Sequence, residues 1–570
     1  MTEISMSLNI TFSDTLRASE AFTSMIQLEA TSFGDIRASV GWTPGVCNGT
    51  AIRNPINDDL FDGDGDLGPQ RAGTVRYPKT MSHSYSSTTF DLWPTPSRPP
   101  SLTSPGRLPG SSSHESVQIL RQVLKDNHEK WHIFFDDFPR HNHITHHLLA
   151  IWAMGADGDI IRRVYDHDIQ IQRPIGSSPE VITKENVYKH VGDARYYKAY
   201  LDFFKDAIRE RDPGKVMEDY IFSYEANYGQ DKPEMLARMM AGLGHGLIHL
   251  GYGAEFGLPG MFVQGLAQAA ASNWPSAPIH PPSLFQGSIE KGSQPPLHAF
   301  TVISRLLADA KFVTKGENFI EMWGDALKVG DAVYELVEQW LPGASEIEKK
   351  IEELHWVAAL LYAVSGYKRG EVVGRGNDDR GFNADFVSMH FATASIFLSS
   401  LMPFLTMRSQ LILLRSSFGM MLLWWIALGR PELDVSAFFD EPLLDISSTV
   451  DSTVSNSVTL PNLNGITPKN NPNPWLGIIQ QSLVHPDDHL PKLVRSLLHF
   501  SDLYGCTAPS TFNDTGLDGA EKIDGTLFLR AAFWTFKRLE KFEEGKEPPE
   551  FLVYGWDFKT FRDGLKGAMS

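Results

Sequence analysis

Four histidines crowd one short stretch of the chain. The segment HNHITHHLLAIWAMGA, residues 141–156, places His141, His143, His146 and His147 within seven positions and then runs apolar to a glycine. Inside a protein, an imidazole ring is costly unless its nitrogens find hydrogen-bond partners or a metal ion. The spacing therefore predicts either well-partnered core histidines or a set of metal ligands at the start of a buried helix.

Two more histidines share the face of a glycine-rich helix. In GLGHGLIHLGYGAEF, residues 242–256, His245 and His249 are four residues apart, which places them one above the other on a helix. The glycines around them would weaken an isolated helix. They make sense where another group must approach the backbone closely.

The remaining candidates lie further along the chain. His390 stands alone in the apolar helical segment DFVSMHFATAS, and HPDDHLPKLVRSLLHF carries His485, His489 and Lys492. Pro491 fits a helix only within its first turn, so a helix is expected to begin just before it. Residues 489 and 492 are three apart and share one face of that helix.

Each candidate also has an ordinary explanation. A lone histidine such as His390 is usually a hydrogen-bonded core residue, and Lys492 on an amphipathic helix is most often a solvated charge. His298 and His355 fit ordinary core or surface positions. Taken together, several histidines in apolar helical settings, with only two cysteines in the chain, favour imidazole ligation of iron, zinc, copper or nickel.

Composition restricts the class of protein. The chain has 570 residues, more than one compact core usually uses, and its formal charge of −18 argues against nucleic acid or an anionic membrane as partner. The first residues show no secretory signal, and the apolar run MMLLWWIAL (420–428) is about half as long as a bilayer span requires. Cys47 and Cys506 cannot form a disulfide framework or a Cys-based zinc site. A cytoplasmic protein without a membrane span is expected.

Apolar residues recur at helical spacing through most of the chain, whereas strand-like alternation is scarce. A helix is expected after Ser112 and Glu115, which have the spacing of a capping box. Further helices are expected near residues 196–211, 233–252, 318–340, 346–365, 384–402, 408–429, 487–504 and 526–541. The predicted fold class is mostly α, an irregular multi-helix bundle.

Residues 1–111 differ from the rest of the chain. The stretch 82–113 is rich in Ser and Pro and lacks periodicity, which is typical of an unstructured linker. We expect residues 1–111 to be a dispensable, largely disordered extension and residues 112–570 to form a helical catalytic domain. Within that domain, residues 447–474 are expected to form a loop insertion. No flavin- or nucleotide-binding fingerprint is found in the helical region.

Several of these segments, in order, resemble the questin oxidase-like family of fungal polyketide gene clusters. The resemblance covers about four-fifths of the chain, from about residue 112 onward. It is carried by NHEKWHIFF, HNHITHHLLAIWAMGA, GLGHGLIHLGYGAEF, DFVSMH, GRPELD, NPWLGIIQQSLVHPDDHLPKLVRSLLHF and DLYG.

The resemblance implies an iron-dependent oxygenase. The family oxidatively opens a ring of anthraquinones such as questin and is linked to Baeyer–Villiger-type steps. By resemblance, a mononuclear non-heme Fe(II) would be held by His143, His245, His390 and His489, with Lys492 as a carbamylated ligand. His249 is the main rival for one of these places. Dioxygen and an aromatic polyketide would be the substrates, and NADPH is a candidate reductant.

The physical chemistry of lysine is compatible with this role. A carbamate forms only from the neutral amine, which burial and a nearby metal both favour, and it supplies a carboxylate oxygen on a long stem. Two other classes of protein remain as alternatives. A carbamylated lysine with histidines also suits a dinuclear metal-dependent hydrolase. The histidines would be structural in a non-catalytic helical binding protein.

Overall fold

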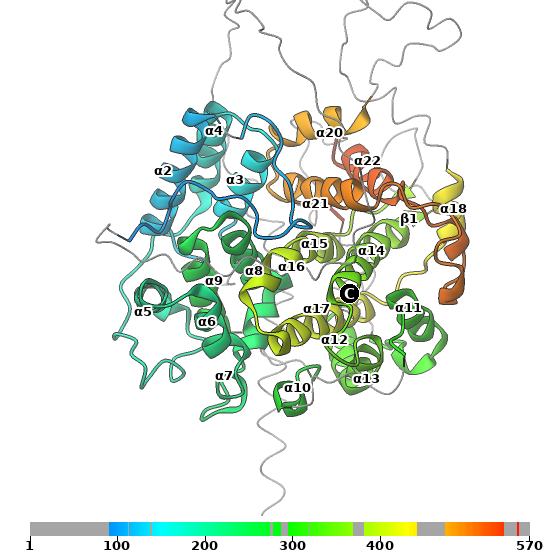
Figure 1. Cartoon of the computed structure of the whole chain (residues 1–570), viewed down its shortest axis with the longest axis horizontal. Coiled ribbons are helices and arrows are strands. Elements are labelled where there is room, and N and C mark those ends of the chain that lie inside the picture. Colours follow the sequence, from blue (N-terminus) through cyan, green and yellow to red (C-terminus); the bar gives the residue numbers. More distant parts are fainter. Residues whose placement is uncertain are drawn as a thin grey trace, which may run out of the picture. The chain divides into compact units, whose positions relative to one another are not determined.

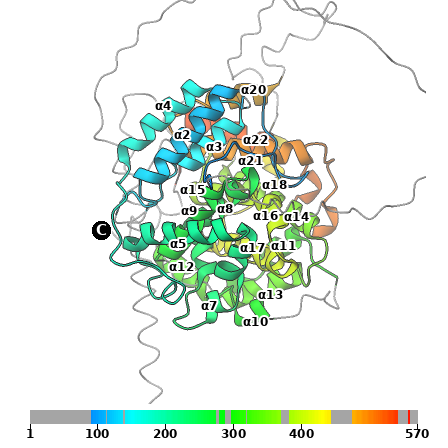
Figure 2. The ribbon, with the colours of Figure 1, turned by 60° about the vertical axis from the view of Figure 1, so that its left-hand side comes forward.

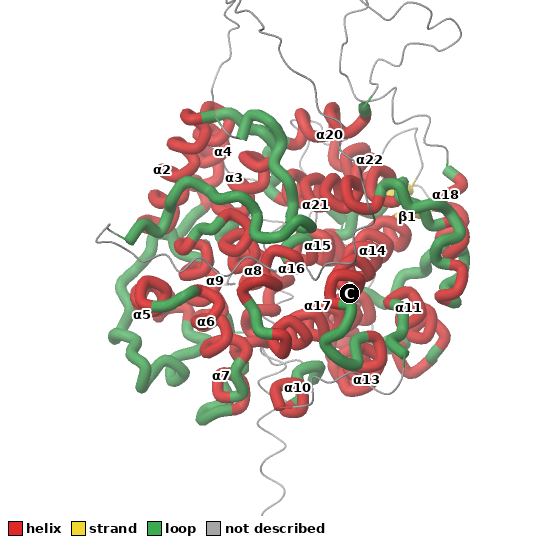
Figure 3. The backbone as a smooth tube through the Cα atoms, viewed as in Figure 1, coloured by secondary structure: helices red, strands yellow, loops and turns green. Residues whose placement is uncertain are grey.

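Helices make up nearly all of the regular structure in the computed structural model of this chain (Figures 1 and 3). The structure describes residues 90–111, 113–136, 140–273, 278–286, 295–316, 319–368, 381–441, 473–540 and 556–557. The chain divides into two units, and all described residues except Phe90 belong to the unit that resumes at Asp91. The expected loop insertion at 447–474 lies outside the described residues, apart from its last two positions.

The described helices follow one another with short connections. The α-helices of the first half are α2 (His114–Lys130), α3 (Ile144–Ala153), α4 (Gly158–Asp168), α5 (Tyr197–Glu210), α6 (Pro213–Met217), α7 (Glu225–Tyr228), α8 (Met235–Phe256), α9 (Pro259–Ala271) and α10 (Pro282–Gln286). Those of the second half are α11 (Ala299–Ala308), α12 (Phe319–Lys328), α13 (Gly330–Trp340), α14 (Ile347–Gly366), α15 (Phe386–Ser395), α16 (Leu398–Leu401), α17 (Met407–Ala427), α18 (Val435–Asp440), α20 (Pro474–Ser482), α21 (His489–Tyr504) and α22 (Leu527–Glu540).

Regular strand structure within the described residues is confined to one short antiparallel pair. It joins β1 (Tyr367–Lys368) to β2 (Gly381–Phe382), with Tyr367 opposite Phe382. Single-turn 3₁₀ or π segments connect several helices: Ile169–Ile171, Ala194–Tyr196, Glu218–Phe222, Ala310–Phe312, Met402–Phe404, Asn513–Thr515 and Ala520–Lys522. The mostly α fold class predicted from the sequence is confirmed.

Most expected helices begin and end within a few residues of their predicted bounds. The helix expected after Ser112 is α2, and the side chain of Ser113 accepts the N–H of Ser116 as its N-cap. Two predictions were wrong in length, because 318–340 divides into α12 and α13 at Gly330, and 384–402 divides into α15 and α16. The helix expected near residues 233–252 is α8, and its backbone departs from helical geometry at residues 241–244.

Two long apolar segments lie in the interior of the protein. Residues 386–404 and 407–427 are long and apolar enough to cross a bilayer by length and composition alone. However, 89% and 94% of the two apolar windows are buried inside the protein, which is typical of core helices. The second segment is α17, which contacts α12, α13 and α14.

Four helices, one of which is α8, pack in a closed cycle. Helix α3 contacts α8, α8 contacts α15, α15 contacts α21, and α21 contacts α3 again. In the views of Figures 1 and 2 these four helices remain neighbours, although α3 and α21 are far apart in sequence. Helix α9 covers the outer side of α8, and α14 covers α15. The cycle encloses the segments in which the sequence placed its candidate histidines.

Residues 90–111 are packed, which corrects the expected boundary of a disordered extension at residue 111. Trp93 is buried, and the N–H of Ser97 donates to the carbonyl of Phe256 at 2.8 Å. Nε2 of His499 lies 3.1 Å from the carbonyl of Thr103. The composition misled the prediction because a Ser/Pro-rich strap can be held by backbone hydrogen bonds and one buried tryptophan. Residues 1–89 lie outside the described residues.

Candidate metal centre

Each helix of the closed cycle contributes one of the predicted ligands. His143 is the N-cap residue of α3, His245 lies in α8, His390 lies in α15, and His489 is the first residue of α21. The side chains of all four are buried or nearly so. The structure therefore brings together residues that span nearly 350 positions of the sequence.

The four imidazole rings form a ring of neighbours in the same order as the helices. The ring centroids of His143 and His245 lie 4.6 Å apart, and those of His245 and His390 lie 5.3 Å apart. His390 and His489 are separated by 5.4 Å, and His489 and His143 close the cycle at 4.8 Å. Four imidazoles gathered this closely offer the type of ligand that transition metals such as iron, zinc and copper accept.

A break in α8 determines where His245 lies. Residues Gly242, Leu243 and Gly244 have φ values of 54°, 61° and 81°, so the backbone is left-handed just before His245. A Cβ atom on Gly242 would lie 2.6 Å from Cε1 of His141. The predicted close approach to a glycine of this segment is confirmed, and the approaching group is an imidazole that stacks on His245 at 4.1 Å.

Hydrogen bonds fix which nitrogen of each ring carries the proton. Nδ1 of His143 lies 2.9 Å from Oδ2 of Asp488, and Nδ1 of His245 contacts the carbonyl of Gly242. Because both oxygens are acceptors, both Nδ1 atoms must be donors, which leaves the two Nε2 atoms as lone pairs. These Nε2 atoms lie only 2.6 Å apart. Two facing lone pairs repel each other unless a cation lies against both of them.

The other two imidazoles also have a ring nitrogen that is free to bind a metal. Nδ1 of His390 donates to the carbonyl of Phe386 at 2.8 Å, so its Nε2 is a lone pair, and that buried atom has no hydrogen-bond partner. Nδ1 of His489 lies 3.2 Å from Oδ1 of Asp488, and its buried Nε2 has no hydrogen-bond partner. Buried polar atoms without partners are rare in folded proteins and call for an explanation. A metal ion held by these four residues fits the orphaned nitrogens.

Burial keeps the rings neutral. Desolvation and, to a smaller extent, the charge of Lys492 lower the pKa of His143 to about 4, although Asp488 opposes the shift. Desolvation also lowers the pKa values of His245 and His390 well below the ordinary value of histidine. At neutral pH these imidazoles therefore keep their lone pairs available for a metal.

Lys492 lies in the cluster as predicted, and its side chain is 5% exposed. Its Nζ lies 2.6 Å from Oδ2 of Asp488, and the same oxygen accepts Nδ1–H of His143. Burial would raise the pKa of Asp488, but the interactions of its carboxylate with His489, Lys492 and His143 outweigh this effect and hold the pKa well below its usual range. Lys492 is therefore buried as an ion-pair partner and is not a solvated surface charge.

Asp488 is a site residue that sequence reasoning missed. Ligand atoms of His143, Asp488 and His489 all lie within 4.8 Å of one another. The signal was present in the sequence, because HPDDH places two carboxylates directly before His489. The cluster thus offers an anionic oxygen ligand whether or not Lys492 is carbamylated.

Comparison with known proteins identifies the chain. A model of the family described as questin oxidase-like matches residues 140–497, which is more than half of the sequence. The chain belongs to the questin oxidase-like family. The matched residues include His143, His245, His390, His489 and Lys492.

The alignments with several curated relatives cover most of the length of each relative. The chain is 28% identical over 402 residues to Baeyer-Villiger oxidase GME11358 of Pestalotiopsis microspora, covering 68% of this chain and 82% of that protein. It is 24% identical over 457 residues to oxidoreductase AflY of Aspergillus parasiticus, covering 76% and 81%. It is 27% identical over 334 residues to questin oxidase of Aspergillus fumigatus, covering 56% and 72%.

These findings confirm that this questin oxidase-like chain is an oxidoreductase. All three relatives are described as an oxidase or an oxidoreductase. They favour an oxidoreductase over the two alternatives left open by the sequence, a hydrolase and a non-catalytic binding protein.

The remaining histidines of the cluster make contacts with each other or with carboxylates. Nδ1 of His249, the rival ligand, lies 2.6 Å from Nε2 of His146, and the centroid of the His146 ring lies 6.1 Å from that of His245. Nδ1 of His147 lies 2.9 Å from Oδ2 of Asp168. The geometry thus separates His249 from the cycle and favours the four predicted histidines.

Asp487 and Trp556 support the position of His489. One oxygen of the buried Asp487 accepts the N–H groups of His489 and Leu490, at 2.9 and 3.2 Å. The same oxygen accepts Nε1–H of the fully buried Trp556 at 2.9 Å. Such outer contacts orient metal ligands and tune their affinity. Nothing in the sequence pattern indicated that a tryptophan near the C-terminus would contact this turn.

Proposed function

We propose that this protein is a non-heme iron-dependent oxygenase that opens the quinone ring of an anthraquinone-type aromatic polyketide in fungal secondary metabolism. The observation that carries the proposal is the pair of Nε2 lone pairs of His143 and His245, 2.6 Å apart. The unpartnered Nε2 atoms of His390 and His489 add to it. Names of relatives, such as questin oxidase and Baeyer-Villiger oxidase, support the substrate class and the reaction type.

The reaction that we infer is insertion of oxygen next to a ring carbonyl. One oxygen atom of dioxygen enters between the carbonyl carbon and its ring carbon, which gives a lactone, and the other leaves as water. That second half requires two electrons and two protons, which NADPH and one solvent proton supply. Water then cleaves the lactone to a benzophenone carboxylic acid.

The chain's own residues would prepare the site for this chemistry. When bound, ferrous iron would supply the activation of dioxygen. His143, His245, His390 and His489 would hold it, and burial favours the neutral form of the first three because it lowers their pKa values. An anionic oxygen would come from a carbamylated Lys492 or from Asp488. Asp488 also keeps the proton of His143 on Nδ1.

Metal analysis coupled to turnover tests the proposal. Protein made under iron-replete conditions should contain near-stoichiometric iron and should consume dioxygen with questin and NADPH. A lactone or a benzophenone acid should appear only in air, and omission of NADPH should prevent its formation. Active protein that contains only zinc, or turnover that continues without dioxygen, would overturn the proposal in favour of a hydrolase. We also propose a cytoplasmic location, where NADPH is available.

A further inference from the structure

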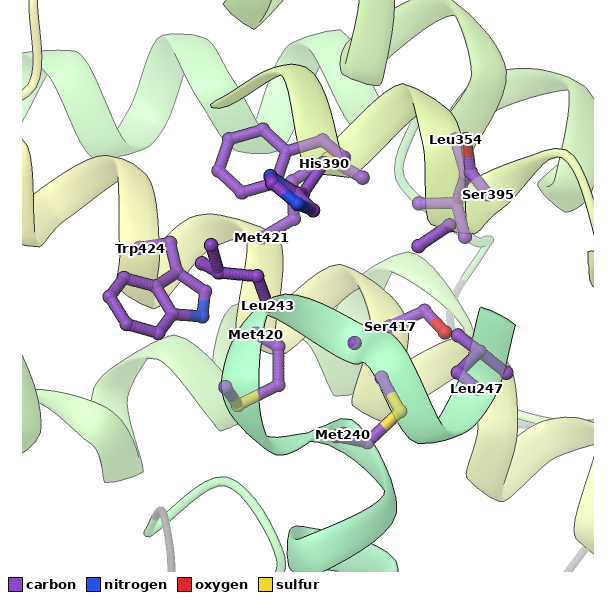
Figure 4. Close-up of a pocket in the computed structure, with 13 residues that line it drawn as sticks. Met240, Leu243, Leu247, Leu354, His390, Ser395, Ser417, Met420, Met421 and Trp424 are labelled. Carbon is purple, nitrogen blue, oxygen red and sulfur yellow. The ribbon is translucent and has the colours of Figure 1, made fainter. Parts of the chain in front are cut away.

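An apolar cavity lies directly against the four-histidine cycle. Helices α8, α14, α15 and α17 form its walls, and His390 is both a member of the cycle and a wall residue (Figure 4). Leu243 and Gly244, which belong to the break in α8 just before His245, also line it. The cavity therefore touches the candidate metal centre through two of its four helices.

The volume of the cavity decides what it can hold. It is about 40 Å³. A single water molecule needs about 10–15 Å³ by the same kind of measure, and an apolar cavity that binds benzene has about 150 Å³. The space is too small for a three-ring aromatic molecule. It is large enough for a diatomic gas or a xenon atom.

The lining disfavours water. Most of the wall is made of aliphatic, aromatic and thioether side chains, among them Met240, Met420, Met421 and Trp424 (Figure 4). The hydroxyl of Ser395 already donates to the carbonyl of Ala392 at 3.2 Å. If Nε2 of His390 serves as a ligand, Ser417 Oγ is the wall hydroxyl left without a partner. A water molecule needs two to four polar partners to be stable in a buried site.

We propose that this cavity, formed where Leu243, Met240 and Met421 meet His390, is a binding site for dioxygen beside the metal centre. The inference rests on the proposed function, since it assigns the oxygen substrate of that same site to a place in the fold. A small apolar cavity concentrates an apolar gas relative to water, and this one ends at a proposed ligand. Flexible methionine side chains let such a molecule pass without a permanent channel.

Xenon binding tests the cavity without any turnover. Crystals of the metal-free wild-type protein under xenon pressure should show a xenon atom between His390 and Met421. The substitution Ala394→Leu fills the cavity from α15, because Ala394 lines it, and should abolish the xenon site. Ala394→Ser, which is nearly equal in size to the wild-type side chain, should keep it. Absence of xenon from the wild-type protein overturns the inference, whatever the turnover.

Oxygen kinetics provide the second arm. In iron-loaded protein, Ala394→Leu should raise the KM for dioxygen about tenfold or more, while the KM for questin and the iron content stay as in Ala394→Ser. Ser417→Leu fills the cavity from α17 and replaces the first variant if that one fails to fold. An unchanged KM for dioxygen in a filled variant that has lost xenon overturns the dioxygen assignment. Failure of the proposed function would look different, with xenon bound but no oxygen consumption in any variant.

Discussion

Nζ of Lys492 lies 2.6 Å from Oδ2 of Asp488, the same carboxylate oxygen that lies 2.9 Å from Nδ1 of His143. This contact links the two candidate anionic ligands of the site. While Lys492 is a cation it stabilises Asp488 as a carboxylate, and carbamylation would replace that attraction by repulsion between two anions. Only one of the two oxygen ligands can therefore be the favoured partner of the metal in a given state.

Lys492 is predicted to be required for iron binding. Lys492→Ala should lower turnover by orders of magnitude and reduce the iron content, whereas helicity is barely affected because alanine is a good helix former. Lys492→Arg is the matched control, since a guanidinium can keep the ion pair with Asp488 but cannot form a carbamate. Turnover and iron content of both variants, with circular dichroism, provide the measurement.

The arginine variant separates the two roles of the lysine. If carbamylation matters, Lys492→Arg should be as inactive as Lys492→Ala, and native mass spectrometry of the wild type should show the added mass of carbon dioxide. Near-normal turnover in Lys492→Arg would instead assign the lysine to the ion pair. In that case Asp488→Asn becomes the variant that loses the anionic ligand and the iron.

The four histidines of the cycle are predicted to bind the metal as a unit. Removing His245 or His390 should abolish iron binding, because it leaves three imidazoles with one side of the site open. Added Fe(II) should raise the melting temperature of the wild type, since a ligand that saturates a site 100-fold stabilises the folded state by about 2.7 kcal/mol. His390→Ala should lose this shift and His249→Ala should keep it. An iron-induced shift that disappears in His249→Ala alone would move the site towards His146.

Residue types singled out the candidate histidines, because imidazoles are uncommon in apolar helices, whereas the proposed set of four ligands came from the family resemblance. His390 is a polar residue in a segment that is otherwise buried and apolar, so its imidazole needs a specific partner there. Helical periodicity also located α15 and α21, because their apolar faces pack into the core. The convergence of four segments on one point could not be derived from spacing, since it depends on how α3, α8, α15 and α21 pack.

Two features of the structure could not be predicted from the sequence, for physical reasons. The break at residues 241–244 includes Leu243 in a left-handed conformation, which costs energy and is stabilised only by its surroundings. The ordered strap at residues 90–111 lacks periodicity because it follows the surface of other helices and does not form one itself. Both depend on contacts between distant segments, and a local pattern contains no information about these.

The strap is predicted to contribute to stability. Trp93 is 4% exposed, and its carbonyl accepts Nε–H of Arg121 at 2.6 Å. Trp93→Ala should lower the free energy of unfolding by about 3–5 kcal/mol, as is usual for removal of a buried tryptophan side chain. A chain that begins at residue 90 should remain soluble and bind iron, whereas one that begins at residue 113 should be markedly less stable. Equal denaturation midpoints for these two truncated chains would contradict the packing described here.

Acid is predicted to destabilise the protein partly through His355, which lies away from the metal centre. This side chain is fully buried, with Nε2 3.0 Å from the carbonyl of Ser395 and Nδ1 3.1 Å from the hydroxyl of Tyr504. Desolvation lowers its pKa from 6.5 to about 3. Between these pH values the unfolded chain binds a proton that the folded chain does not. Stability therefore falls with falling pH through this window, by about 1.4 kcal/mol per pH unit for this one group.

The slope is measured by urea denaturation of metal-free protein between pH 4 and pH 6, in steps of about half a pH unit. His355→Gln should flatten the slope by about one proton, because glutamine keeps a donor for Ser395 and does not titrate. The variant is expected to be less stable than the wild type at pH 7 and to approach it in acid. A slope that does not change would show that His355 is not a source of the proton uptake.

Trp556 is predicted to position a metal ligand through Asp487. Its Nε1–H donates to Oδ1 of Asp487 at 2.9 Å, and this same oxygen caps the N–H groups that begin α21 at His489. Trp556→Phe removes the hydrogen bond but keeps an aromatic ring beside His489. The Asp487 carboxylate then loses one of its buried donors, and the orientation of His489 is less well fixed. Iron affinity should fall about 10–100-fold, as is typical when an outer partner of a metal ligand is lost.

Trp425→Phe is the matched control for this prediction, because Trp425 is also fully buried and its Nε1 has no hydrogen-bond partner. Both substitutions remove a similar apolar volume from the core, so both should lower the melting temperature of the metal-free protein, and Trp556→Phe should lower it further because it also removes the hydrogen bond to Asp487. Only Trp556→Phe should weaken iron binding, as measured by titration of metal-free protein with Fe(II) under anaerobic conditions. If the two variants bind iron equally well, the tryptophan packs against the site without positioning His489. If Trp425→Phe alone weakens binding, the cavity side of α17 controls the metal centre instead, since Trp425 lies next to the cavity-lining Trp424.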